Sequence, residues 1–188
     1  MLWLTNMPDN AMNLVLIETP YQKNILTSKF LIMNKASYIY EGHSAVTPSL
    51  TVQGAGAAIE WYKKVFGAKE TRRMDGPDKT IGHAELKIGD SLIFLADENP
   101  QFNTKSPKKT NGNSIFLYVY VPDVDETIQR VRANNGRVVQ EPQDMFYGDR
   151  CSHIEDPFGF DWTVATHVRD VSEAEMKKGM EKMMHEHA

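Results

Sequence analysis

The feature that most constrains the fold is an internal repeat. Each copy begins with a strand pattern and continues with a helical pattern that a glycine closes: residues 46–52, 57–66 and Gly67 in the first copy, and residues 114–121, 124–132 and Gly136 in the second. Corresponding valines and glycines of the two copies are equally far apart in the sequence. A pattern that recurs with one period is typical of a duplicated structural unit.

The second halves of the copies also correspond. His83-Ala-Glu85 and His153-Ile-Glu155 stand at equivalent places, and each copy ends in an apolar strand pattern, at 91–96 and 161–166. The sequence therefore predicts an α+β protein of two βαβββ modules. The expected organisation is an N-terminal extension at 1–45, modules at 46–98 and 114–168, a linker at 99–113, and a C-terminal helix or tail at 169–188.

The N-terminal extension lacks a sustained helical or alternating period. Leu14-Val-Leu-Ile17 is its best strand candidate, and Met33 would serve as a start nearer to the repeat. We expect this extension to be partly disordered or an over-called start, with an ordered arm on the core as the alternative.

One helix covers only one face of each sheet, so the other face has to close against something. Strand alternation predicts which side chains lie on this open face: Thr47, Ser49, Thr51, His83, Glu85 and Lys87 in the first module, and Phe116, Tyr118 and Tyr120 in the second. An aromatic wall opposite a few polar groups is typical of a cleft for a small organic ligand.

Composition excludes several other classes of partner. The net charge of -4 and the lack of a long Lys/Arg cluster argue against nucleic acid. Charged residues and prolines interrupt the one candidate membrane segment near the start. A single cysteine, Cys151, cannot form an intramolecular disulfide, which fits the reducing cytoplasm. We expect a cytoplasmic protein without nucleic-acid or membrane partners.

Four separated motifs resemble one known family: residues 51–67, His83-Ala-Glu-Leu86, Phe146-Tyr-Gly-Asp-Arg150 and Asp156-Pro-Phe-Gly159. Together they resemble the vicinal oxygen chelate superfamily of glyoxalases, bleomycin-resistance proteins and dioxygenases, and within it the PhnB-like branch. The resemblance implies paired βαβββ modules that form a curved mixed sheet around a cleft, in a homodimer.

Metal-dependent members of that superfamily take ligands from the first and last strands of each module. The resemblance carries these positions to Thr47, Phe94, Phe116 and Thr163, which do not form a normal ligand set for a divalent metal. We therefore expect no cofactor at the usual positions. A divalent metal held elsewhere is the alternative.

The expected function is to bind a small organic molecule in the cleft between the modules. The alternative is a lyase, isomerase or dioxygenase-like enzyme that uses His83 and Glu85, which alternation places on one strand face. If His153 and Glu155 converge on the same cleft, they would complete an acid/base or metal site. The opposing interpretation is that all four are structural.

The remaining candidate ligand-binding residues are Thr47, Ser49, Phe94, Phe116, Tyr118, Tyr120, Tyr147 and Arg150. Arg150 would clamp an anionic group and Tyr147 would close over it. Alternatively, Asp149 and Arg150 would pair with each other or brace the turn. Asp156-Pro-Phe-Gly159 is a structural turn signal. Ser172 and Glu175 form a capping box that predicts a helix to about residue 184.

Overall fold

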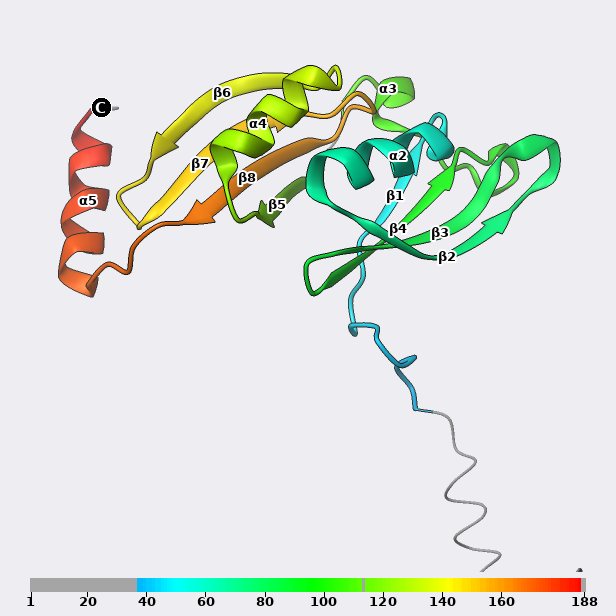
Figure 1. Cartoon of the computed structure of the whole chain (residues 1–188), viewed down its shortest axis with the longest axis horizontal. Helices are drawn as coiled ribbons and strands as arrows, with labels where there is room; N and C mark the ends of the chain where they lie inside the picture. The colour runs from blue at the N-terminus through cyan, green and yellow to red at the C-terminus, as the bar shows by residue number, and fades with distance from the viewer. Residues whose placement is uncertain (1–36, 113, 187–188) are drawn as a thin grey trace, which may run out of the picture. The chain divides into compact units, whose positions relative to one another are not determined.

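Both repeated segments fold as a strand, a helix and three strands, as the sequence predicts (Figure 1). The structure is a computed structural model that describes residues 37–112 and 114–186. The chain divides into two units, Met1–Gly42 and His43–Ala188; both modules belong to the second. The predicted strand at 14–17 and the alternative start at Met33 lie outside the described residues.

Each module has its own four-stranded mixed sheet. The first contains β1 (Ser49–Val52), α2 (Ala55–Phe66), β2 (Lys69–Asp75), β3 (Ile81–Ile88) and β4 (Ser91–Asp97), in the sheet order β1-β4-β3-β2. The second contains β5 (Phe116–Tyr120), α4 (Val124–Ala133), β6 (Arg137–Asp144), β7 (Asp149–Glu155) and β8 (Asp161–His167), in the order β5-β8-β7-β6. The first and last strands of each module pair in parallel. The two sheets are therefore built alike.

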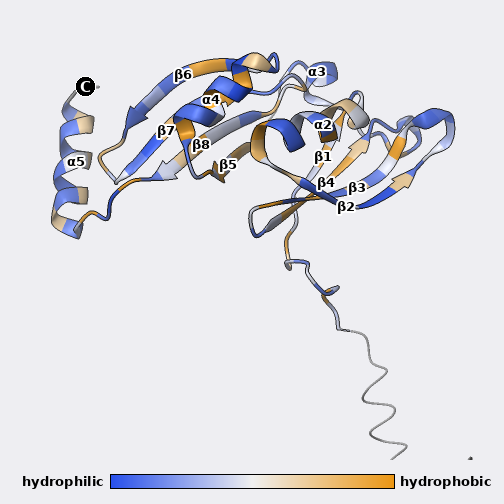
Figure 2. Ribbon diagram, in the orientation of Figure 1, coloured by the Kyte–Doolittle hydropathy of each residue, from blue (hydrophilic) through white to orange (hydrophobic). Residues whose placement is uncertain are grey.

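The strand faces divide as alternation predicts. Leu50, Ala84 and Leu86 are buried on the helix side, and Val119 is buried in the second module. Open-face residues such as Tyr118 remain exposed. The edge strands of the two sheets differ in composition: β2 is mostly hydrophilic and β5 is hydrophobic (Figure 2).

The N-terminus of α2 is held by a side chain from the far end of its module. Gly54 supplies no capping side chain. Instead one carboxylate oxygen of Asp97 accepts hydrogen bonds from Gly54 N and Ala55 N, at 2.9 and 2.8 Å, and the other accepts from Ile81 N. Because a carboxylate satisfies the free amides of a first helical turn, Asp97 ties α2 to β3 and β4.

The two helices end differently. Gly67 closes α2 in the left-handed conformation, at φ 67°, as predicted. Gly136, predicted for the same role after α4, does not have it: the left-handed residue is Asn135, at φ 64°. Gly136 is needed for close packing, because a Cβ there would lie 2.6 Å from Val131 Cγ1.

The segment between the modules is more ordered than a plain linker. It contains a short 3-10 turn, η2 (Pro100–Phe102), and a short helix, α3 (Pro107–Thr110). Glu98 accepts hydrogen bonds from Ser106 N and Ser106 Oγ, both at 2.8 Å. Ser106 is buried, so this side chain fixes the path of the connection.

The C-terminal helix α5 (Glu173–Glu186) begins with the predicted capping box. Ser172 N donates to Glu175 Oε2 at 2.9 Å, and Glu175 N donates to Ser172 Oγ at 3.3 Å. A Cβ on Gly179 would overlap Phe146, which shows how closely α5 packs on the loop between β6 and β7. No helix in the described part of the chain has the length and apolarity needed to cross a membrane.

The modules meet through a buried carboxylate in the Asp156-Pro-Phe-Gly159 turn. Asp156 Oδ2 accepts from Tyr62 Oη of α2 at 2.7 Å and from Trp162 Nε1 of β8 at 2.9 Å. Its other oxygen accepts from Phe158 N and Phe160 N. The structural role predicted for this turn is confirmed, and its side chain also joins the two modules.

Aromatic rings pack beside Asp156, and two further hydrogen bonds join α2 to α4 and to the residue that follows α4. The rings of Phe66 and Trp162 lie 4.9 Å apart, and those of Tyr62 and Trp162 lie 5.6 Å apart. Trp61 Nε1 donates to Asn134 O, and Arg130 Nε donates to Val65 O. Burial raises the pKa of both Asp156 and Tyr62.

Tyr62→Phe should destabilise the protein by about 1 kcal/mol, because it removes one donor from a buried carboxylate and adds no cavity. Chemical denaturation measures the change. Tyr38→Phe is the matched control, since Tyr38 is 95% exposed, and it should leave the midpoint unchanged. Equal midpoints for the two variants would show that the Tyr62–Asp156 contact contributes nothing to stability.

Candidate functional site

The open face of the second module carries an exposed aromatic row above a buried carboxylate. Tyr118 Oη and Tyr120 Oη both donate to Asp149 Oδ2, at 3.1 and 2.8 Å. The tyrosines come from β5 and Asp149 from the start of β7, two strands away in the sheet. Because one carboxylate oxygen holds both hydroxyls, the two rings are fixed in place, with centroids 5.1 Å apart.

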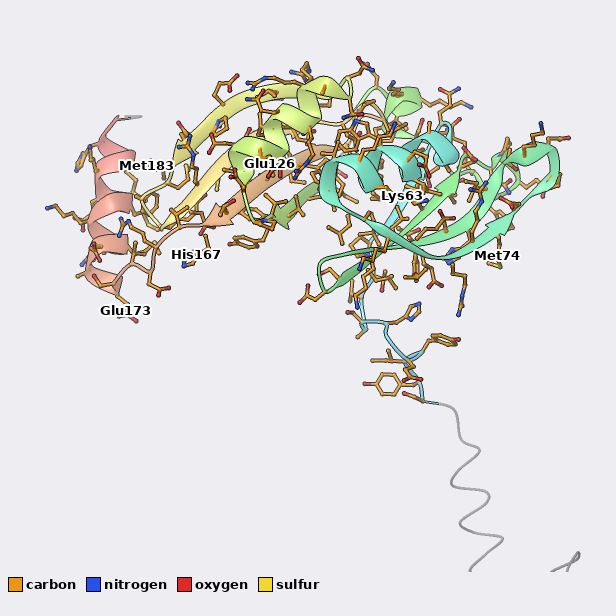
Figure 3. The ribbon with its side chains drawn as sticks, in the orientation of Figure 1. Lys63, Met74, Glu126, His167, Glu173 and Met183 are labelled. Carbon is orange, nitrogen blue, oxygen red and sulfur yellow. The ribbon has the colours of Figure 1, made fainter. Side chains whose placement is uncertain are left out.

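Asp149 is also paired with a histidine. His167, where β8 ends (Figure 3), places Nδ1 2.7 Å from Asp149 Oδ1 and Nε2 3.1 Å from Asp170 Oδ1. The contact with Asp149 first, and that with Asp170 second, raise the pKa of His167. Burial acts to raise the pKa of Asp149, but hydrogen bonds from His167, Tyr120 and Tyr118 outweigh it, so this pKa lies below its ordinary value.

Cys151 lies under the same aromatic row. Its thiol is buried, with Sγ 3.3 Å from Tyr118 Oη and 3.6 Å from Tyr147 Oη. Burial, followed by the hydrogen bond to Cys151, raises the pKa of Tyr147 to about 12. Three candidate binding residues, Tyr118, Tyr120 and Tyr147, are therefore joined into one network by Asp149 and Cys151.

Phe116 continues the aromatic row toward the start of β5. Its ring centroid lies 5.4 Å from that of His153, whose Nε2 is 3.6 Å from Asp161 Oδ1. Thr163, on β8, pairs in register with both Tyr118 and His153. The composition of the open face therefore changes along β5: Phe116 and His153 lie at one end, and the tyrosines and Asp149 lie at the other.

The open face of the first module is centred on Glu85, which is 5% exposed. His83 Nε2 and Arg72 Nη1 each lie 3.4 Å from Glu85 Oε1, and His43 Nε2 lies 3.5 Å from Oε2. The rings of His43 and His83 both contact Phe94, with centroids 5.7 and 4.8 Å away. His83, Glu85 and Phe94 thus lie together, because β3 and β4 are neighbouring strands.

The two His-x-Glu strands have separate partners. His153 lies beside Asp161, and Glu155 forms an ion pair with Arg137, all within the second module. Glu85 is surrounded by residues of the first module and its preceding segment. In the described part of the chain, no group of three or more His, Cys, Asp or Glu side chains is placed so that it could hold a metal ion.

The four positions that the resemblance assigns to metal ligands carry side chains that cannot bind a divalent metal in the usual way. Phe94 and Phe116 offer only hydrocarbon rings, and Thr47 and Thr163 offer neutral hydroxyls. Divalent metals in such sites need imidazole or carboxylate ligands. These four residues do not fit a metal.

Three other candidate residues lie apart from the aromatic row. Arg150 is directed to the helix side of β7, where it donates to both oxygens of Asp125 on α4 and to Asp144. Arg150 therefore bonds Asp125 and Asp144, and the expected pairing with Asp149 is wrong, because Asp149 lies on the opposite face of β7 with Tyr118, Tyr120 and His167. Ser49 lies opposite Phe94 in the register of β1 and β4, and Thr47 is half-buried in the segment before β1.

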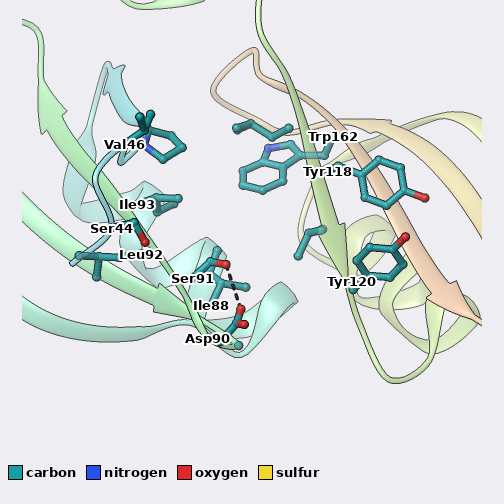
Figure 4. Close-up of a pocket in the computed structure, with 14 residues that line it drawn as sticks. Ser44, Val46, Ile88, Asp90, Ser91, Leu92, Ile93, Tyr118, Tyr120 and Trp162 are labelled. Carbon is teal, nitrogen blue, oxygen red and sulfur yellow. Dashed lines mark hydrogen bonds between the residues drawn. The ribbon is translucent and has the colours of Figure 1, made fainter. Parts of the chain in front are cut away.

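A pocket of about 350 Å³ lies between the modules (Figure 4). It is bordered by residues 44–48, the turn between β3 and β4, and strand β5. Trp162, Leu117 and Val119 belong to the helix side of the second sheet, so this pocket is not the aromatic open face. In Figure 4 the rings of Tyr118 and Tyr120 lie on the opposite side of β5 from Trp162.

Sequence reasoning did not propose Asp149, His167, Cys151 or His43 as members of a site. Asp149, Cys151 and His153 alternate along β7, so the period of two could have placed the first two beneath Tyr118. His167 required the register of β7 and β8, which pairs it with Asp149. His43 precedes the repeat, where no periodicity indicates a position.

Two βαβββ modules, each with its own four-stranded mixed sheet, define the fold class of this chain. The model of the glyoxalase/bleomycin resistance protein/dioxygenase superfamily matches residues 43–164. The chain therefore belongs to this superfamily.

The relatives agree with this assignment. An uncharacterized protein of Mycobacterium bovis is 34% identical over 72% of this chain and 91% of its own length. Lactoylglutathione lyase of Neisseria meningitidis is 29% identical over 59% of this chain and 81% of its own.

Two solved structures share the fold. TioX from Micromonospora has a TM-score of 0.53 at 25% identity, over 66% of this chain and 99% of its own. The PhnB protein of Bacillus cereus has a TM-score of 0.51 at 18% identity, over 65% of this chain and 99% of its own. The likeness to PhnB is one of fold.

We expect the pKa of His167 to lie above about 6.5 and to fall in Asp149→Asn, because the amide cannot stabilise an imidazolium as a carboxylate does. Asp170→Asn should lower this pKa less. Ring-proton NMR across a pH series measures both. An unchanged value in Asp149→Asn would contradict the assigned contact.

The same pair predicts how stability depends on pH. The raised pKa of His167 gives a contribution that is complete below about pH 6.5 and is lost as pH rises through that pKa. The lowered pKa of Asp149 gives one that is lost as pH falls through it. The difference in stability between the wild type and Asp149→Asn should therefore be largest in mildly acidic solution.

Proposed function

We propose that this protein binds a small organic molecule on the aromatic open face of the second module, without the metal that many members of its superfamily use. One observation carries the proposal: Tyr118 and Tyr120 donate to a single oxygen of the buried Asp149 while their rings stay exposed. The hydroxyls are satisfied by the protein, so the ring faces are left for a ligand.

The exposure of these rings supports binding. Phe116, Tyr118 and Tyr120 are 65%, 49% and 62% exposed, side by side on one strand. A cluster of exposed aromatic residues is unfavourable in water unless a ligand or partner covers it. Because Asp149 already orders the tyrosines, the protein would lose less conformational entropy when a planar ligand binds.

We propose that a second copy of the chain covers the aromatic open face of the second module. Within one chain the modules meet through α2 and the Asp156 turn, so this contact leaves the aromatic row uncovered. We propose a homodimer in which the partner closes the open face. A cytoplasmic location is proposed with it, on the single-cysteine argument alone.

The second candidate function is an enzyme that uses His83 and Glu85. The observation that favours it is the buried carboxylate of Glu85 between two imidazoles, those of His43 and His83. Such a group can exchange a proton with a substrate when a neighbouring imidazole takes or returns one. The lactoylglutathione lyase relative provides a reaction to assay.

A thermal-unfolding screen against aromatic metabolites and antibiotics tests the binding proposal. A ligand present at about 100 times its Kd stabilises the folded state by about 2.7 kcal/mol. Asp149→Ala should abolish the shift in midpoint, because it releases both tyrosine hydroxyls. Asp144→Ala is the control, since Asp144 bonds Arg150 on the other face. A ligand shift that persists in Asp149→Ala would refute this site.

The enzyme alternative predicts turnover that depends on the first module. Formation or breakdown of lactoylglutathione should be lost in both His83→Ala and Glu85→Gln, with ligand binding retained. His185→Ala, near the C-terminus, is the control. Absence of turnover in the wild-type protein, with or without added zinc, nickel or manganese, would count against the enzyme for this substrate.

A further inference from the structure

Strand β5 has an unguarded edge. Four strands lie at sheet edges: β1, β2, β5 and β6. Edge strands normally carry charges or proline, or are very short, because their unpaired amides invite another strand. β1 has only four residues and follows Pro48, β2 contains Lys69 and two arginines, and β6 contains Pro142. β5 is Phe-Leu-Tyr-Val-Tyr, with no charge and no proline.

The free backbone groups of β5 can be identified from its register. Val121 N donates to Ala165 O, and Val121 O accepts from Thr166 Oγ1, so both backbone groups of Val121 face β8. In a parallel pair the residues two apart face the same neighbour. Tyr118 and Tyr120 therefore direct N–H and C=O to the free edge, where none of the described residues pairs with them.

This free edge borders the pocket between the modules. Tyr118 and Tyr120 contribute to its lining, although their rings lie away from Trp162 (Figure 4). They therefore face the pocket with their backbone. Apolar side chains line it on both sides, Ile88 and Ile93 from the first module and Leu117, Val119 and Trp162 from the second, and Ser44, Asp90 and Ser91 add polar groups.

We infer that this pocket binds a short extended peptide segment with aliphatic side chains, which pairs with β5 as an added strand. Alternating donors and acceptors in the plane of a sheet match an extended peptide backbone, and the apolar walls match aliphatic side chains. The volume of about 350 Å³ is near the lower limit for ligand pockets. It suits a segment of roughly three residues.

The site is distinct from the proposed ligand face. That face uses the rings of Tyr118 and Tyr120, which Asp149 holds through their hydroxyls, whereas the peptide site uses their backbone amides and the opposite side of β5. A variant that alters a ring hydroxyl can therefore separate the two sites.

Amide hydrogen exchange with the capped peptide acetyl-Val-Leu-Val-amide tests the inference. At saturating peptide, exchange at Tyr118 N and Tyr120 N should slow tenfold or more. Leu117 N and Val119 N should not change, since they already face β8. The same peptide methylated on each peptide nitrogen should give no protection, because the methyl groups remove the donors to Tyr118 O and Tyr120 O and keep the two backbones too far apart to pair.

Two variants of the chain complete the test. Ser91→Trp, at the exposed end of the pocket, should abolish protection by the peptide, and Ser91→Ala should retain it. Tyr120→Phe should retain it too, because the backbone is unchanged.

Three results would overturn the inference. They are uniform or absent protection along β5, equal protection by the methylated peptide, and protection of Tyr118 and Tyr120 that rises with protein concentration in the absence of peptide. The last would assign this edge to a second copy of the chain.

Discussion

The arrangement of the two modules depends on the carboxylate of Asp156. It accepts four hydrogen bonds, two from the backbone of its own turn and two from the buried side chains of Tyr62 and Trp162. An unpaired carboxylate in that position would be very unfavourable, so the turn, α2 and β8 must form together. This contact sets the position of β5 relative to the first module, and hence the pocket between them.

The same contact explains why duplication does not produce one symmetric site. Because the modules join through α2 and the Asp156 turn, the buried acid of each open face has its own set of partners. Each has developed its own chemistry around one buried acid. Glu85 is surrounded by His43, His83 and Arg72, whereas Asp149 is surrounded by two tyrosines and His167.

These surroundings favour different functions. Fixed, exposed rings above Asp149 are suited to binding, because their polar groups are already satisfied. A buried carboxylate between imidazoles is suited to proton transfer. The membership of the chain in the glyoxalase/bleomycin resistance protein/dioxygenase superfamily is compatible with both, since a fold does not specify a reaction.

The sequence by itself determined the duplicated modules, the side-chain alternation on each strand and most helix ends, because these follow from local periodicity and turn chemistry. It placed Tyr118 and Tyr120 on the open face and His83 beside Glu85 for the same reason. Tertiary structure decided that Asp149 and His167 join the tyrosines, that Arg150 bonds Asp125 on α4, and that His43 reaches Glu85. Those contacts depend on strand register and on chain segments distant in sequence, which no local pattern records.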